Sequence, residues 1–248
     1  MQFGLIGYPL GHSYSKGHFS NKFEREGLVD CRYDNFEISS ADQLKEIIFR
    51  HPDLRGLNVT IPHKQAVIPF IDEIDPTALQ IGAVNTIKIF RSDNVCLKGY
   101  NTDVIGFQKS LERWPLRSSI NALVFGTGGS SLAVKHALNR LNIKYISVSR
   151  NFSHDQIPYE SITREIAANH LLWINCTPVG MFPDITSLLP LPYDCLTSSH
   201  YLFDLIYNPD MTRFLSMGVR AGAKVMNGSI MLYEQAEASW RIWTEEQE

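Results

Sequence analysis

The fold is indicated most clearly by one stretch, Asn121-Ala122-Leu123-Val124-Phe125-Gly126-Thr127-Gly128-Gly129-Ser130-Ser131. Residues 121–125 are an apolar run that predicts a buried strand, and a glycine-rich turn follows it directly. Ala133, Ala137 and Leu141 then recur on one face of a predicted helix. A strand, a glycine-rich turn and a helix in this order are typical of dinucleotide-binding units, although an ordinary strand-to-helix turn is the alternative.

In the dinucleotide interpretation, the glycines let the backbone approach a pyrophosphate, whose charge faces the N-terminus of the helix. Ser131 stands where the usual pattern has its third glycine, and it is still a small residue. The residues of the turn that we expect to contact the cofactor are Gly126, Thr127, Gly128, Gly129 and Ser130.

The next predicted strand, residues 145–149, ends at Arg150 rather than at an acidic residue. A protein that binds NAD normally has an acidic side chain near this point for the ribose hydroxyls, and the first one here is Asp155. An arginine can instead pair with a 2′-phosphate and lie flat on the adenine. Arg150, with Ser149 and Asn151 on either side, therefore predicts NADP as the cofactor.

The remainder of the second half continues the alternation of strands and helices. Apolar runs predict strands at 171–175, 202–206 and 223–226, and a helix follows from about 229 to 243. The segment from Cys176 to Met181 comes at the carboxyl end of the first of these strands, where parallel α/β sheets bind ligands. Cys176 could be a nucleophile, but no activating partner is evident, so we expect a packed thiol.

The first half alternates in the same way and predicts a mostly parallel sheet that ends in a hairpin. Helices are expected at about 16–26 and 41–49, and residues 65–79 should be helical in parts because Pro69 and Pro76 interrupt them. The strands are expected at 2–6, 33–38, 56–61, 83–90 and 95–99, and the last two pair across the turn at 92–94.

The third of these strands runs into Asn58-Val59-Thr60-Ile61-Pro62-His63-Lys64, which places an ammonium at a strand-to-helix turn. Asp103 precedes a predicted helix over 104–111. Each residue has an ordinary alternative, because Lys64 could be a surface lysine and Thr102 or Asp103 could cap the helix. If Lys64 and Asp103 share a closed pocket, they form a proton relay, because each keeps the other charged until a substrate arrives.

Two further motifs carry polar groups on short turns. Ser13 and Ser15 are two residues apart, so on extended backbone their hydroxyls point the same way and can donate to one carboxylate. The alternative is that one of them caps the helix that follows. Asn85 carries an amide that both donates and accepts, and it could equally satisfy backbone groups in a turn.

Composition and charge exclude several classes of protein. The 248 residues are 44% hydrophobic, which allows two modest domains, and the net charge of −3 gives no basic surplus for nucleic acid. The chain opens without the pattern of a signal peptide, and no apolar run approaches the ~20 residues that span a bilayer. The cysteines form no Cys-x-x-Cys pair and the histidines no His-Glu-x-x-His pattern. We therefore expect a cytoplasmic protein with reduced thiols, no metal, no membrane and no nucleic-acid partner.

These motifs, in this order, resemble those of the shikimate dehydrogenases over nearly the whole chain. The Asn-Val-Thr-x-Pro-x-Lys motif of that family is present at residues 58–64. The other matching segments are Ser13-Tyr14-Ser15, residues 82–86, 99–103, 126–129, 175–181 and 204–207, and Asn227-Gly228 through Gln235.

The resemblance implies two α/β domains with a cleft between them. Residues 1–101 would form a substrate-binding domain with a mostly parallel sheet, completed by the helix 229–248, and residues 102–228 a Rossmann-like NADP-binding domain. The implied reaction is the reversible NADPH-dependent reduction of 3-dehydroshikimate to shikimate, in the pathway to chorismate and the aromatic amino acids. The expected partner is this small-molecule substrate, and we expect a monomer or a homodimer.

The resemblance also implies roles for individual residues. The lysine and aspartate of the family that match Lys64 and Asp103 are its catalytic pair. The substrate would be held at its carboxylate by Ser13 and Ser15, and at its ring by Thr60, Asn85, Asn101, Tyr207 and Gln235. The cofactor would contact, besides the glycine turn, Ser149, Arg150, Asn151, Thr177, Leu205 and Gly228.

Several positions depart from the family's pattern, and three alternatives stay open. Lys16 replaces a usual proline, Phe19-Ser20 replaces a His-Asn pair, and His154 stands where a second basic residue is expected near the 2′-phosphate. The nearest alternative is a paralogue that acts on quinate or an aminated analogue. Another is a methylene-tetrahydrofolate dehydrogenase, against which the paired serines and the Lys64–Asp103 couple argue. The last is a catalytically silent NADP-binding regulator.

Overall fold

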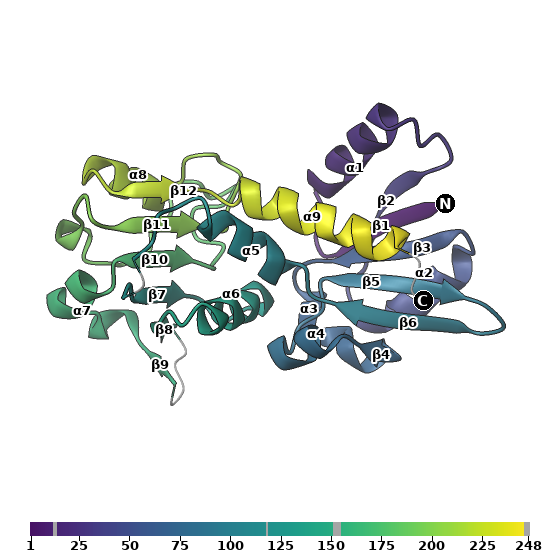
Figure 1. Ribbon diagram of the computed structural model, residues 1–248, viewed down its shortest axis with the longest axis horizontal. Helices are drawn as coiled ribbons and strands as arrows, with labels where there is room; N and C mark the ends of the chain where they lie inside the picture. Colours follow the sequence, from purple (N-terminus) through teal and green to yellow (C-terminus); the bar gives the residue numbers. More distant parts are fainter. Residues whose placement is uncertain (12–13, 118, 151–154, 246–248) are drawn as a thin grey trace. The chain divides into compact units, whose positions relative to one another are not determined.

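The structure, a computed structural model, describes residues 1–11, 14–117, 119–150 and 155–245. The chain divides into two compact units (Figure 1). Unit 1 consists of Met1–Ile105 and Tyr233–Glu248, and unit 2 consists of Gly106–Leu232. This division places Asp103 in the same unit as Lys64, whereas the predicted boundary after residue 101 placed the two in different domains.

Unit 1 is built on a six-stranded sheet with the order β2-β1-β3-β5-β6-β4. β1 pairs in parallel with β2 and β3, whereas β5 and β6 form an antiparallel hairpin beside β3. The predicted parallel strands followed by a hairpin are therefore confirmed. The strands are β1 Gln2–Gly7, β2 Arg32–Glu37, β3 Leu54–Val59, β4 Glu73–Ile74, β5 Thr86–Arg91 and β6 Val95–Tyr100.

Several boundaries in unit 1 differ from the prediction, and β5 begins at Thr86 instead of Ala83. β3 ends at Val59 instead of Ile61, although the backbone N–H of Thr60 still donates to the carbonyl of Ile6 at 2.9 Å. The predicted partly helical segment 65–79 contains the short strand β4 between its helices. The helices of this unit are α1 Tyr14–Arg25, η1 Ala41–Gln43, α2 Leu44–Arg50, α3 His63–Ala66, η2 Ile68–Phe70, α4 Pro76–Ile81 and the major part of α9 Ser229–Thr244.

Side chains alternate between the two faces of the unit 1 sheet, and both faces carry apolar residues. Helices therefore cover both faces. Phe3 of β1 is buried with Phe19 of α1 and Trp243 of α9. On the opposite face, Ile6 is buried with Leu44 of α2 and other apolar side chains of the α2–α4 segment. Figure 1 shows α1 and α9 on one side of the sheet and α3 and α4 on the other.

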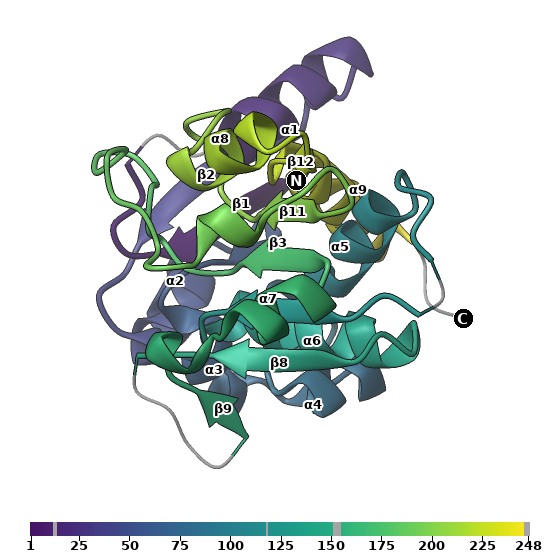
Figure 2. The same cartoon turned by 90° about the vertical axis from the view of Figure 1, so that its left-hand side faces the viewer.

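Unit 2 is built on a second six-stranded sheet, with the order β12-β11-β10-β7-β8-β9. Every strand pair in it is parallel, which is the arrangement of a Rossmann-like fold. Figure 2 shows β8 and β9 together with α7 of this unit. The strands are β7 Ala122–Phe125, β8 Tyr145–Val148, β9 Gln156–Ile157, β10 Leu172–Asn175, β11 Tyr201–Asp204 and β12 Lys224–Met226.

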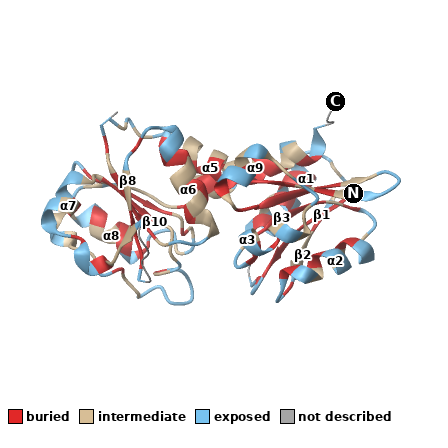
Figure 3. Cartoon of the chain, turned by 90° about the horizontal axis from the view of Figure 1, so that it is seen from below, coloured by how far each residue is buried: buried red, intermediate tan, exposed pale blue. Residues whose placement is uncertain are grey.

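Figure 3 shows β10 coloured as buried, and apolar side chains on both faces of this sheet form the core of unit 2. Trp173 of β10 and Phe214 of α8 belong to the cluster on one face. On the other face, the ring of Phe203 in β11 lies 5.2 Å from that of Phe107 in α5, centroid to centroid. The helices are α5 Asp103–Leu111, which begins in unit 1, α6 Gly129–Arg140, η3 Tyr159–Ser161, α7 Arg164–Asn169, η4 Tyr193–Cys195 and α8 Arg213–Arg220.

Among the described residues, neither a membrane-spanning helix nor a cluster of metal ligands is present. None of their helices combines the length and the apolar character that crossing a membrane requires. Within the same ranges, no three His, Cys, Asp or Glu side chains are grouped as ligands of a metal ion.

Candidate active site

Lys64 and Asp103, which lie far apart in the sequence, meet in unit 1. The ammonium Nζ of Lys64 is 2.5 Å from Oδ2 of Asp103, and their side chains are only 12% and 7% exposed. Lys64 lies on α3, where its backbone carbonyl accepts from the N–H of Val84 at 2.7 Å. Its neighbour His63 is buried, and its ring Nε2 lies 2.7 Å from the carbonyl of Ile38. These two hydrogen bonds, one from the backbone of Lys64 and one from the ring of His63, anchor the turn that carries the lysine.

Asp103 is the first residue of α5, but it does not cap that helix with its side chain. The side-chain Oδ1 of Asn101 accepts from the N–H of Val104 at 3.4 Å, and the Asn101 amide donates to the carbonyl of Ala83 at 2.8 Å. The hydrogen bond to the first turn of the helix thus comes from Asn101, and not from Thr102 or Asp103 as in the alternative interpretation of these residues. This arrangement leaves the Asp103 carboxylate available to Lys64 and to its second partner.

Asn85 is that second partner, and its orientation follows from its own contacts. The backbone N–H of Thr102 donates to Asn85 Oδ1 at 2.7 Å, which identifies the oxygen side of the amide. The Nδ2 of Asn85 therefore points to Oδ1 of Asp103, to which it donates at 2.9 Å. Both carboxylate oxygens of Asp103 accept hydrogen bonds, one from the amide of Asn85 and one from the ammonium of Lys64.

A cluster of buried hydroxyls supports Asn85, and the sequence analysis did not identify it. The hydroxyl of Thr86 lies 2.7 Å from that of Ser239, which in turn lies 3.1 Å from that of Thr102. Thr86, Thr102 and Ser239 are each fully buried. Ser239 lies on α9 four positions after Gln235 and donates to the Gln235 carbonyl at 2.9 Å. The spacing of Gln235 and Ser239 on one helix face was the signal that could have revealed Ser239.

The cluster continues through Asn58 to the proposed carboxylate-binding end. Asn58 Nδ2 donates to the hydroxyl of Ser239 at 2.9 Å, and Asn58 Oδ1 accepts from the phenol of Tyr33 at 2.8 Å. The hydroxyl of Ser15 is hydrogen-bonded to Tyr33. Burial raises the pKa of Tyr33 well above its ordinary value, against a smaller lowering by Ser15, so the phenol keeps its proton. Side-chain hydrogen bonds thus connect Asp103 with Ser15.

The remaining predicted substrate contacts are distributed over both units. Ser15 is 8% exposed in the first turn of α1, and Thr60 is partly exposed directly after β3. Gln235 is buried, and its Oε1 lies 3.4 Å from Asn85 Nδ2. Tyr207 follows β11 in unit 2 and is partly exposed. Ser13 lies outside the described residues.

The glycine-rich turn has the backbone that its sequence predicts. Gly126 adopts a φ of 101°, a conformation that favours glycine, and a Cβ there would lie 2.9 Å from Cγ2 of Thr177. Gly128 is the N-cap of α6, and the backbone N–H groups of the first turn of this 12-residue helix point toward its N-terminal end, where that of Ser131 donates to the carbonyl of Gly128 at 2.9 Å. Thr127 and Gly128 are exposed, and Gly129 and Ser130 are partly exposed. This turn can approach a phosphate closely.

A second close approach involves two residues that were predicted to contact the cofactor. A Cβ on Gly228 would lie only 2.1 Å from the backbone carbonyl oxygen of Leu205, so only glycine fits. Gly228 N–H also donates to the carbonyl of Ile206 at 3.0 Å. The loops after β11 and β12 are therefore in direct backbone contact.

The predicted adenine side of the cofactor site shows one exposed cation. Arg150 is exposed and forms no ion pair with any carboxylate in the described part of the chain, which leaves its guanidinium available to an anion. Ser149 is buried, and its backbone N–H donates to Ile157 at 3.0 Å. Asn151 and His154 lie outside the described residues.

Asp204 organises the loops at the carboxyl edge of the unit 2 sheet. Its carboxylate accepts from Asn175 Nδ2 at 3.0 Å, from the N–H of Ile206 at 3.0 Å and from the hydroxyl of Thr212 at 2.7 Å. Asn175 Oδ1 accepts in turn from the backbone N–H of Thr177 at 2.9 Å. Burial raises the pKa of Asp204 to about 6, against a smaller lowering by these hydrogen bonds.

Cys176 follows β10 beside this network. Burial raises the pKa of its thiol far above the ordinary value, against a smaller lowering by the nearby Lys135. A thiol that holds its proton this strongly is a poor nucleophile. The geometry therefore supports the interpretation of Cys176 as a packed residue.

Comparison with known proteins agrees with this arrangement. Residues 5–87 match the family model described as the shikimate dehydrogenase substrate binding domain. A shikimate dehydrogenase (NADP(+)) from Methanosphaera stadtmanae is 35% identical over 261 residues, which cover 97% of this chain and 90% of the relative.

Two solved structures have the same fold over almost the whole chain. A shikimate 5-dehydrogenase from Thermus thermophilus, in complex with NADP(H) and shikimate, superposes with a TM-score of 0.84 at 30% identity and covers 98% of this chain and 93% of that one. A quinate dehydrogenase from Corynebacterium glutamicum, in complex with NAD, superposes with a TM-score of 0.85 at 27% identity, with coverage of 98% and 93%.

Proposed function

Because the chain belongs to the shikimate dehydrogenase family, we propose that it reduces 3-dehydroshikimate reversibly to shikimate with Lys64 and Asp103 as the proton-transfer pair. The chain is an NADP-dependent oxidoreductase that acts on a CH–OH group, in the pathway to chorismate and the aromatic amino acids. The observation that carries the assignment of the pair is the 2.5 Å contact between the Lys64 ammonium and the Asp103 carboxylate.

The pair is suited to move the proton of a secondary alcohol. In the direction of reduction, the Lys64 ammonium donates a proton to the ring oxygen as the carbonyl carbon is reduced, and solvent returns a proton to the lysine. In the direction of oxidation, the same amine accepts the hydroxyl proton. Asp103 stabilises the charged lysine, and Asn85 keeps one Asp103 oxygen at a fixed position by donating at 2.9 Å.

The substrate contacts that we propose lie at two ends of the ring. Ser13 and Ser15 hold the carboxylate, because hydroxyl donors suit an anion, and Tyr207 contacts the substrate as well. Thr60, Asn85, Asn101 and Gln235 are the proposed partners of the ring hydroxyls. The amide of Asn101 also donates to the carbonyl of Ala83, and its side-chain oxygen accepts from the N–H of Val104, so a ring hydroxyl would share these groups. Fixing the ring in this way supplies part of the barrier lowering.

The residues of unit 2 fit a dinucleotide phosphate. The turn at Gly126 brings backbone, without side-chain obstruction, to the N-terminus of α6, which favours a pyrophosphate. Arg150, with no ion pair to a described carboxylate, suits a 2′-phosphate. We propose that Ser149, Asn151, Thr177, Leu205 and Gly228 complete this site. When bound, NADPH supplies the hydride that reduces the carbonyl carbon.

An absorbance assay at the NADPH band tests this function. Shikimate and quinate are each supplied with NADP and with NAD, and initial rates give kcat/KM for the four combinations. We expect shikimate with NADP to be used most efficiently. A higher kcat/KM for quinate would assign the chain to the activity named for the Corynebacterium glutamicum structure, and binding without turnover of either alcohol would contradict an enzymatic role.

A further inference from the structure

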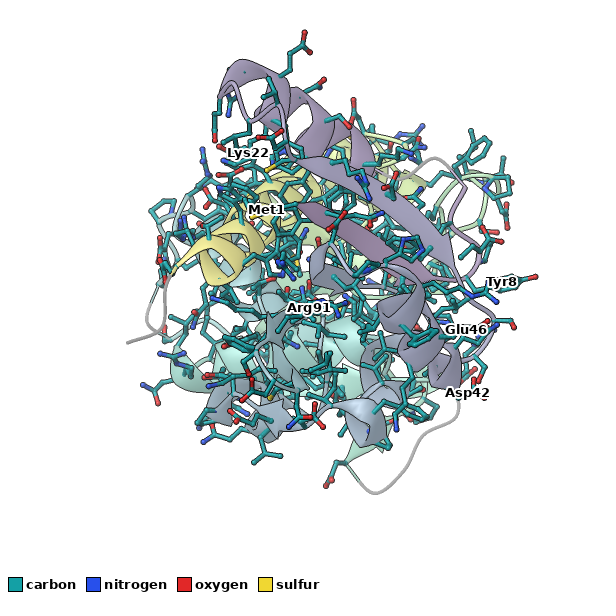
Figure 4. All side chains as sticks on the ribbon, turned by 90° about the vertical axis from the view of Figure 1, so that its right-hand side faces the viewer. Met1, Tyr8, Lys22, Asp42, Glu46 and Arg91 are labelled. Atoms are coloured by element: carbon teal, nitrogen blue, oxygen red, sulfur yellow. The ribbon has the colours of Figure 1, made fainter. Side chains whose placement is uncertain are left out.

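Helix α1 carries Ser15 and is tied to helix α9 by one carboxylate. The side chain of Glu237 on α9 lies 2.9 Å from Nε2 of His18 through Oε1, and 2.9 Å from Nζ of Lys22 through Oε2. His18 and Lys22 are four positions apart on α1, so they share one face of that helix. Figure 4 labels Lys22 on α1, next to the ribbon of α9. No step of the proposed reaction uses these three residues.

The three side chains are largely removed from solvent. His18, Lys22 and Glu237 are 10%, 7% and 17% exposed, and all three belong to unit 1. Burial alone would raise the pKa of Glu237, but hydrogen bonds and charge from Lys22 and His18 lower it overall. Burial alone would lower the pKa of Lys22, but its bonds to Glu237 and Glu26 raise it. The contact between Lys22 and Glu237 is therefore an ion pair at neutral pH.

Aromatic rings enclose this ion pair on both helices. The ammonium of Lys22 lies 5.8 Å from the ring centroid of Trp240 on α9. The ring of His18 lies 5.4 Å from that of Tyr233 on α9 and 5.9 Å from that of Tyr14 on α1. Removing Glu237 would leave Lys22 paired with Glu26, which is outside α9, and would take away the carboxylate that His18 contacts. Glu237 thus fixes the position of α1 along α9.

The residues next to this tie are those proposed to hold the substrate. Ser15 lies three positions before His18 on α1, and its hydroxyl is bonded to Tyr33. Gln235 lies two positions before Glu237 on α9. A shift of α1 along α9 therefore moves Ser15 relative to Gln235. Because an anion is held through short hydrogen bonds, a small displacement of one donor weakens them.

We propose that Glu237 is a positioning residue which, by holding His18 and Lys22, sets the place of Ser15 and thereby the affinity for the carboxylate of the substrate. This inference rests on the proposed function, which assigns the carboxylate to Ser13 and Ser15. The contacts of Glu237 with His18 and Lys22, which tie α1 to α9, take no part in the proton transfer proposed for Lys64 and Asp103. Loss of these contacts is therefore expected to raise KM for the substrate and to leave kcat unchanged.

The test compares Glu237→Gln with the matched control Glu26→Gln. Glu26 contacts the same ammonium, Nζ of Lys22, at 3.0 Å, but it follows α1 in the chain and does not reach α9. We expect Glu237→Gln to raise KM for shikimate about three- to tenfold with kcat and KM for NADP near the wild-type values, and Glu26→Gln to change none of them by more than about twofold. Lys22→Met should reproduce the effect of Glu237→Gln, and the double variant should not multiply it.

A substrate without the charged end separates positioning from a general loss of structure. The methyl ester of shikimate should lose little further affinity in Glu237→Gln, because the contact that the tie positions is already weakened. An equal loss for acid and ester, an unchanged KM for shikimate, or a fall in kcat alone would each overturn the inference. Thermal unfolding of each variant shows whether it is folded.

Calorimetric binding of shikimate keeps this test independent of turnover. If the wild-type protein binds shikimate without oxidising it, the proposed function fails while the ratio of dissociation constants between Glu237→Gln and wild type still tests the inference. If the wild-type protein oxidises shikimate and Glu237→Gln binds it as tightly as Glu26→Gln does, the inference fails and the proposed function stands. If shikimate does not bind to the wild-type protein, both fail.

Discussion

Each unit of the molecule contains a buried aspartate that accepts from an asparagine, but the two aspartates have different surroundings. Asn85 donates to Asp103 at 2.9 Å in unit 1, and Asn175 donates to Asp204 at 3.0 Å in unit 2. Asp103 also has the ammonium of Lys64 at 2.5 Å. Asp204 has no cation within ion-pair distance among the described residues, and its other partners are a hydroxyl and a backbone N–H.

We propose that this difference separates a carboxylate that takes part in the reaction from one that holds loops in place. A lysine beside such a carboxylate can exchange a proton with a reacting oxygen. A carboxylate with neutral donors holds loops in place and is costly to ionise, which agrees with the pKa of about 6 that burial gives Asp204. The same Asn–Asp pair therefore occurs in two settings, which differ in the presence of the Lys64 ammonium beside Asp103.

The largest expected effect is on the cation itself. Lys64→Ala should lower kcat by about 10²–10⁴ with KM little changed, because it removes the group that exchanges the hydroxyl proton and leaves Asp103 buried without its counter-charge. Steady-state rates with shikimate and NADP measure this effect. Lys45→Ala, at an exposed position of the same unit, is the control. A Lys64→Ala variant that kept most of its kcat would remove Lys64 from the chemistry.

The next effect is on stability and concerns Asp204. A carboxyl whose pKa is raised in the folded state binds its proton more tightly there than in the unfolded chain, so its stabilising contribution is present at low pH and is lost as pH rises. With a pKa moved to about 6, this loss falls between pH ~4 and pH ~6 and amounts to about 3 kcal/mol.

Urea unfolding at a series of pH values measures this contribution. Asp204→Asn keeps the shape of the side chain without its charge, so the variant should lose the decline of stability between pH ~4 and pH ~6 relative to wild type. If the two proteins show the same pH dependence over this range, Asp204 is not the group that titrates there.

A smaller effect is expected at the exposed cation of unit 2. Arg150→Ala should raise KM for NADP about tenfold to a hundredfold and change KM for NAD by less than about threefold, because only NADP carries the 2′-phosphate. Kinetic constants with both cofactors provide the measurement. An equal loss with both cofactors, or a wild-type protein that uses NAD better than NADP, would show that Arg150 does not select the phosphate.

The smallest effect concerns the support of Asp103. Ser239→Ala removes a buried hydroxyl that lies 2.9 Å from Asn58 Nδ2 and 2.7 Å from the Thr86 hydroxyl. We expect a loss of about 1–3 kcal/mol in unfolding free energy and a fall of a few-fold in kcat, since Asn85 loses part of its support. Ser20→Ala, on the exposed side of α1, is the control and should change neither quantity. A Ser239→Ala variant with the stability and the kcat of wild type would show that the hydroxyl cluster does not support Asp103.

The sequence allowed the fold and the principal site residues to be predicted to different degrees. The alternation of strands and helices was visible because strands such as β7 are continuous apolar runs beside glycine turns. β4 and β9 were missed because two-residue strands have no periodicity to detect. The ends of β3 and the cap of α5 depended on Thr60 and Asn101, whose hydrogen bonds are set by neighbouring segments.

The candidate site shows the same limit. Lys64 and Asp103 could be paired because the resemblance to the shikimate dehydrogenases matches them to the catalytic pair of that family, whereas from their positions alone each had an ordinary alternative. The hydroxyls of Thr86, Thr102 and Ser239 could not be placed together, because their contacts require three elements in a specific register. Glu237 resembled any helical surface acid until its contact with Lys22 was seen.

The central claim is that the carboxylate next to a lysine takes part in the chemistry whereas its counterpart in unit 2 does not. The most direct test is kcat for Asp103→Asn measured beside Asp204→Asn, with shikimate and NADP at saturation. We expect a fall of at least about 10² for Asp103→Asn and of no more than about threefold for Asp204→Asn. Equal losses in the two variants, or an Asp103→Asn protein as fast as wild type, would contradict it.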